Sequence, residues 1–129
     1  MLLFPSSAFR KRRVRTQRKP PAPPVALMLV SASFDAGLVI LRLNFDRPIN
    51  ISGLSAGQLI VNDHDTDTQY GGQGAGMLID PTTVDVEMTE LQSMGFPDTR
   101  LTTIGPSGIV AVDDGGTWAG VVDLLLPFP

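Results

Sequence analysis

The chain has 129 residues, 43% of them hydrophobic, with 13 glycines, 11 prolines and no cysteine. That length accommodates one domain around one core, and the lack of cysteine excludes a disulfide framework and thiol chemistry. Frequent turn residues with few long helical runs favour an all-β fold, and no apolar run approaches the roughly 18–20 residues of a transmembrane segment.

The net charge of −3 combines two segments of opposite sign. Seven of the ten basic residues lie within positions 10–19, whereas the first acidic residue is Asp35. From Val25 onward, three basic residues stand against thirteen acidic ones, which gives this part a net charge of −10. A basic arm on an acidic body is the strongest functional signal in the sequence. The arm cations are Arg10, Lys11, Arg12, Arg13, Arg15, Arg18 and Lys19.

Residues 1–24 are predicted to be a disordered basic arm followed by a proline-rich linker. Met1–Arg18 has no regular apolar pattern, so burial cannot offset the entropy cost of ordering it. The four prolines between positions 20 and 24 favour a short polyproline II spacer. A β-sandwich domain is then expected over residues 25–129.

A secretory signal is not favoured. Its apolar core would be Val25–Val30, which is shorter than the roughly 7–15 residues that such a signal needs. The sequence does not fix the compartment, but it favours a virion or cytoplasmic location over secretion.

The first two predicted strands are Val25–Ser33 and Gly37–Ile49. In the second, apolar and polar residues alternate with the period of two of a half-buried strand. Pro48 lacks a backbone donor, so this strand should stop near Arg47. The residues expected to face inward are Val39, Leu41, Leu43 and Phe45, and those expected to face outward are Arg42, Asn44 and Asp46.

The middle of the chain reads as short strands joined by polar turns. Gln58–Asn62 is a predicted strand, followed by a polar turn at Asp63–Thr68. Gly71–Gly76 lacks the lysine and hydroxyl residue of a phosphate loop, and a flexible or tightly turning hairpin is expected there. Met77–Asp80 should be a short strand ended by Pro81.

The rest of the chain continues this pattern, for a total of seven or eight strands. Val84–Leu91 alternates cleanly, with Val84, Val86 and Met88 expected inward. Arg100–Ile104 is the next strand. Ile109–Val112 and Trp118–Leu126 flank Asp114–Gly115, a dipeptide that suits a tight hairpin.

Two segments resemble bacterial immunoglobulin-like modules. LVILRLNFDRPINI is similar to their strand-and-turn in which an acidic residue and a proline follow alternating apolar residues, and GIVAVDDGGTWAG resembles their penultimate hairpin. The resemblance covers roughly residues 25–128. It implies an immunoglobulin-like antiparallel β-sandwich that acts as a non-catalytic spacer, adhesion or virion-surface module.

Few residues suggest a metal or catalytic site. Asp63, Asp65 and Asp67 have the spacing of the first three ligands of a Ca²⁺ loop, but the required Gly and Glu positions hold Thr68 and Gly74. We therefore predict no metal or cofactor, although a site between loops that also uses Asp113 or Asp114 stays open. His64, the only histidine, lies in the same polar turn and is not expected to act as a catalytic base.

The arm has several candidate partners. Polyanion binding is favoured, with nucleic acid first and an acidic protein surface second, while a solvated tail and membrane attraction stay open. We expect a non-enzymatic structural or accessory module, such as a phage or virus-like particle component tethered through its arm. The alternative is a cell-surface adhesion or carbohydrate-binding module, in which Tyr70 and Trp118 could form a ligand platform.

Overall fold

The computed structural model describes residues 23–126 of the chain. This part is built from nine β-strands and one 3₁₀ turn, η2, with no α-helix among the described residues, which confirms the all-β expectation. The strands are β1 Leu29–Asp35, β2 Ile40–Phe45, β3 Ile49–Asn50, β4 Leu59–Asp63, β5 Thr68–Asp80, β6 Thr83–Ser93, β7 Arg100–Thr103, β8 Val110–Ala111 and β9 Leu124–Leu125, and η2 spans Ala56–Gln58.

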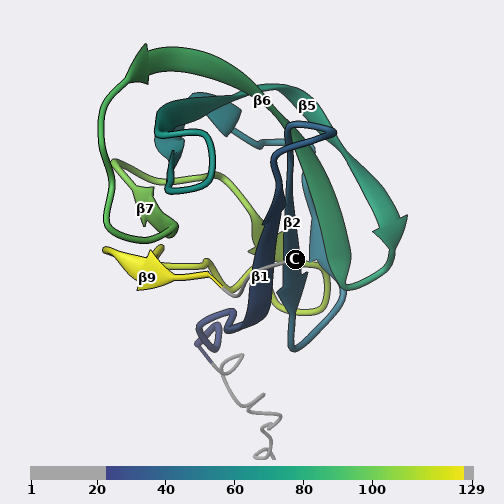
Figure 1. The fold of residues 1–129 in the computed structure, drawn as a ribbon. Helices are drawn as coiled ribbons and strands as arrows, with labels where there is room; N and C mark the ends of the chain where they lie inside the picture. The colour runs from purple at the N-terminus through teal and green to yellow at the C-terminus, as the bar shows by residue number, and fades with distance from the viewer. Residues whose placement is uncertain (1–22, 127–129) are drawn as a thin grey trace, which may run out of the picture.

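Seven of these strands form one curled antiparallel sheet (Figure 1). Their order is β1-β2-β6-β5-β4-β7-β9, and β3 and β8 form a separate two-stranded sheet. A typical immunoglobulin domain instead divides seven strands between sheets of four and three. The main sheet encloses one hydrophobic core on its concave side, and Ile49 and Ala111 of the small sheet pack into that core.

Strands β2 and β6 confirm the two predicted alternations. Leu41 and Leu43 of β2 lie opposite Val86 and Val84 of β6, and all four are fully buried. Burying one such side chain contributes about 1.5–3 kcal/mol to folding, so this pair of strands anchors the core. The outward residues between them form a second, solvent-facing surface of the same two strands.

The start of the chain differs from the prediction in two places. Strand β1 begins at Leu29 rather than at Val25, and it extends to Asp35. Val39, predicted to be an inward strand residue, has a φ of 56° and ends the turn that precedes β2. Asp35 stabilises this turn because its Oδ1 accepts the N–H groups of Gly37 (2.9 Å) and Leu38 (3.1 Å).

The hairpin predicted at Gly71–Gly76 was wrong, because these residues lie inside the 13-residue strand β5. A Cβ on Gly72 would lie 2.1 Å from the carbonyl oxygen of Ala56, so glycine lets η2 pack directly on the strand. The pairing with β6 shifts register between Gln73 and Met77, and Gly76 has a φ of 75° there. Gly74 and Gly76 therefore lie in a β-bulge instead of a loop, whereas Gly71 and Gly72 pair regularly with β6.

The C-terminal part keeps the predicted turn but little of the final strand. Gly115 has a φ of 75° and donates its N–H to the carbonyl of Ala111 at 3.1 Å, as the tight turn requires. Of the predicted strand Trp118–Leu126, only β9 is regular, and a single bridge joins Val110 to Thr117.

Candidate interaction site

A shallow groove crosses the outer face of strands β1, β2, β6 and β5. Three adjoining hollows make up this outer groove, since neighbouring hollows share Ser33 and Arg42 or Ile40 and Asp85. Its charged members are Asp35, Arg42, Asp80, Asp85 and Glu87, and its large apolar members are Leu38, Ile40, Met77 and Ile79. The groove thus joins residues that lie more than 50 positions apart in the sequence.

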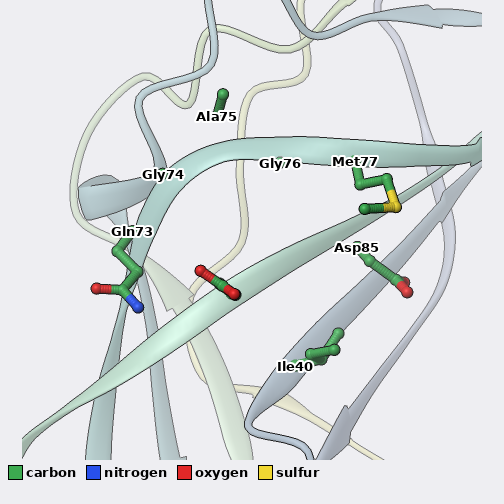
Figure 2. A pocket seen from close by; sticks show the side chains of 8 residues that line it. Ile40, Gln73, Gly74, Ala75, Gly76, Met77 and Asp85 are labelled. Carbon is green, nitrogen blue, oxygen red and sulfur yellow. The ribbon is translucent and has the colours of Figure 1, made fainter.

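The β5 bulge forms one wall of the hollow at one end of the groove, which has a volume of about 300 Å³. Ile40 of β2, Met77 of β5 and Asp85 of β6 face this hollow from three different strands (Figure 2). The Met77 side chain is 66% exposed, because the bulge turns it away from the core. The bulge therefore places an apolar side chain beside two carboxylates, those of Asp85 and Glu87.

Arg42 and Asp85 form a two-pronged ion pair at the centre of the groove. Arg42 Nε lies 2.8 Å from Asp85 Oδ1, and its terminal nitrogen lies 2.9 Å from Oδ2. The hydrogen bonds and charge of Asp85 raise the pKa of Arg42, while hydrogen bonds from Thr82 lower the pKa of Asp80. With its one arginine already paired, the groove presents a net negative surface.

A second cluster, the root clamp, fixes the start of the body. Here Arg47 donates to the carbonyl of Val25 at 2.6 Å, and the Val25 N–H donates to Asp114 Oδ2 at 2.9 Å. Arg47 also pairs with Asp113 at 2.9 Å and with Asp114 at 3.1 Å. The N–H groups of Val25 and Gly116, and then Arg47, lower the pKa of Asp114 to about 2.

The aspartates with Ca²⁺-loop spacing are used for other contacts. Asp63 is only 2% exposed; its Oδ2 accepts the N–H (3.1 Å) and hydroxyl (2.7 Å) of Thr66, and its Oδ1 accepts the Thr99 hydroxyl (3.0 Å). Asp65 is exposed, and Asp67 accepts the N–H of Phe96 at 3.4 Å. Within residues 23–126, no three His, Cys, Asp or Glu side chains gather as metal ligands.

The histidine and the aromatic residues also have structural partners. His64 Nδ1 bonds to the carbonyl of Phe96, which ties the β4–β5 turn to the loop before β7. Tyr70 packs against Phe34 with ring centroids 5.0 Å apart, and Trp118 packs edge-on against Phe45 at 5.3 Å. Both rings are buried, so Tyr70 and Trp118 do not form an exposed ligand platform.

The seven predicted polyanion-binding residues between Arg10 and Lys19 lie outside the described residues. Sequence reasoning missed both the outer groove and the root clamp. One sequence signal for the groove was available: the apolar residues of Met77–Asp80 directly follow the glycines and can continue the same strand. For the root clamp, the sequence shows Arg47 before a proline and the distant pair Asp113 and Asp114, but no local pattern connects them.

Across residues 23–126, the structure has no helix that is long and apolar enough to cross a membrane. Comparison with protein families, with curated proteins and with solved structures finds no match.

Proposed function

We propose that this protein is a non-enzymatic structural or accessory module whose basic arm tethers its β domain to an anionic partner. That partner is nucleic acid or the acidic surface of a neighbouring subunit. The proposal is carried by one observation, the way in which the charges of the chain are divided and paired.

Every arginine of the described body is engaged with a carboxylate. Arg42 pairs with Asp85, Arg47 pairs with Asp113, and Arg100 lies 2.6 Å from Asp98. The sequence from Val25 onward contains no lysine, so these three are its only permanent cations. A polyanion would meet paired arginines and excess carboxylates on this body, which leaves the arm as the cationic site.

The root clamp supports a tethering role for the arm. It holds Val25 through both its N–H and its carbonyl, at the residue after the proline-rich linker. A pull on the arm is therefore transmitted to side chains of the β2–β3 connection and of the 111–116 turn. A tether that transmits force to the domain requires a firm attachment of this kind.

A component of a bacteriophage or virus-like particle is the setting that we propose for this module. There, an arm reaches nucleic acid or a neighbouring subunit while an acidic domain is displayed. The immunoglobulin-like relation belongs to the same proposal, and the all-antiparallel strands with the alternating β2 and β6 support it. Both rest on analogy at the level of the fold.

The test compares the full chain with a variant of equal length in which the seven arm cations are glutamines. Fluorescence anisotropy measures binding to a short DNA duplex at several salt concentrations, and sedimentation measures assembly. If nucleic acid is the partner, the full chain should bind with a log–log salt slope of up to about −6, and the variant should not bind. If a subunit is the partner, the variant should change assembly instead. A variant that changes neither duplex binding nor assembly would refute the tether.

A further inference from the structure

The outer groove is an exposed sheet face that combines negative charge with apolar side chains. Resting on the proposed function, we propose that this groove is the docking surface for the basic arm, residues 10–19, of a second copy of the chain. The groove is then the acidic subunit surface of the proposed function, and the arm of each copy would bind the groove of a neighbouring copy.

Charge complementarity is the first argument for this occupant. The groove contributes four carboxylates, those of Asp35, Asp80, Asp85 and Glu87, against one arginine that is already paired. The arm brings seven cations within ten residues and no acidic residue. Opposite charges of this density attract over a Debye length of about 8–10 Å at physiological salt.

The apolar members of the groove favour a peptide over nucleic acid. Leu38 and Met77 are 70% and 66% exposed, and Ile79 is 44% exposed. The methylene stems of arginine and lysine can cover such side chains while their charged ends reach neighbouring carboxylates. Phosphates would find no cation here that lacks a carboxylate partner, and they would be repelled by Glu87 and Asp80.

The position of the root clamp favours the arm of a second copy over the chain's own arm. The hollow that Met77 lines lies at the Ile40 end of β2, whereas Val25 is clamped beside Arg47, beyond the opposite end of that strand, where the hollow with Asn44 lies. Six residues of strand separate these ends by about 20 Å. Strand β1 starts opposite Phe45 and ends opposite Ile40, so the chain's own arm would have to turn back along the sheet to reach Met77, across a spacer whose four prolines favour an extended course. A neighbouring arm has no such constraint.

The absence of cysteine permits a direct crosslinking test on full-length chains. One chain carries Val14→Cys within the arm, and a second carries Met77→Cys in the groove. The matched control carries Val122→Cys, which is 78% exposed in the bend before β9 at the far end of the main sheet. Mild oxidation of each mixture, followed by non-reducing electrophoresis, measures how fast the mixed disulfide forms. Gln73→Cys, in the same hollow, repeats the test with the methionine intact.

Docking should hold the arm thiol near position 77 at a raised effective concentration, so the disulfide should form about tenfold faster there than at position 122. High salt should remove the difference, and adding Glu87→Gln to the Met77→Cys chain should reduce it. Equal rates at positions 77, 73 and 122 would overturn the groove as the docking surface. A chain carrying both Val14→Cys and Met77→Cys that closes only within itself would overturn the second copy as donor.

The same chains also separate this inference from the proposed function. If crosslinking shows no preference for the groove but the full chain binds a DNA duplex, the groove inference fails and the tether stands. If crosslinking shows no preference and neither duplex binding nor assembly depends on the arm cations, both fail.

Discussion

Two aspartate-rich turns look alike in the sequence, but their carboxylates have different kinds of partner in the structure. In the β4–β5 turn, Asp63 is buried, and its carboxylate accepts three hydrogen bonds from the neutral groups of Thr66 and Thr99. In the 111–116 turn, Asp113 and Asp114 are held by Arg47, a cation from a distant part of the chain. The comparison shows that short runs of aspartate need not indicate a metal site, because hydroxyls, amides and arginine can each occupy the carboxylates.

Removing the buried carboxylate should produce the largest effect. Asp63→Ala leaves the Thr99 hydroxyl and the Thr66 N–H without their acceptor, at a cost of about 3 kcal/mol in the free energy of unfolding. Urea unfolding measures this cost. Asp65→Ala, in the same turn but exposed, is the matched control and should change it by less than about 0.5 kcal/mol. Equal effects from the two substitutions would show that Asp63 does not organise the turn.

Removing the shared cation should affect the root clamp locally. Arg47→Ala deletes the bond to the Val25 carbonyl and leaves Asp113 and Asp114 as close like charges. We expect a smaller loss of stability than for Asp63→Ala, and a clear loss of hydrogen-exchange protection at the Val25 amide. Arg100→Ala, which breaks an ion pair far from Val25, is the control. Unchanged protection of the Val25 amide in Arg47→Ala would contradict the clamp.

The contribution of Asp114 to the 111–116 turn should depend on pH. The folded pKa of Asp114, about 2, lies below the ordinary value of 3.8, so its stabilising contribution is full above 3.8 and is lost as pH falls through 2. Asp114→Asn retains the shape but cannot ionise. Thermal melting should show a gap between wild type and Asp114→Asn at pH 6 that narrows towards pH 2. A gap that stays constant with pH would argue against the ionised carboxylate as its source.

Added calcium should have the smallest effect. Asp63 is turned inward and fully engaged, so millimolar Ca²⁺ should leave the melting temperature of the full chain unchanged. A rise in melting temperature that Asp65→Ala abolishes would instead establish a calcium site in this turn.

The parts of the fold that could be predicted are those that local pattern determines. The alternation in β2 and β6 identified Leu43 and Val84 as core residues, because a strand that is half buried must alternate. The Asp114–Gly115 turn followed from the ability of glycine to adopt positive φ, which is a property of one residue.

The missed parts depend on contacts between distant residues. Gly71–Gly76 reads as a loop from composition, whereas the approach of Ala56 to Gly72 explains why glycine is required at position 72 inside a strand. Three strands, β2, β6 and β5, must pair before Ile40 and Met77 can line the same hollow. No stretch of sequence contains that information, because the strand order places β6 between β2 and β5.

The glycines of β5 also restrict which substitutions the chain could accumulate over evolutionary time. At position 72, any side chain would collide with the backbone of Ala56, so drift to another residue should be blocked. At position 74, the added Cβ would meet nothing within 4 Å, and only the positive φ of 76° limits the choice. Asparagine or aspartate, which tolerate that conformation, could replace glycine there. Gly72 and Gly74, separated by one residue, should therefore be substituted at very different rates. The wall of the groove could change at position 74 while position 72 stayed glycine.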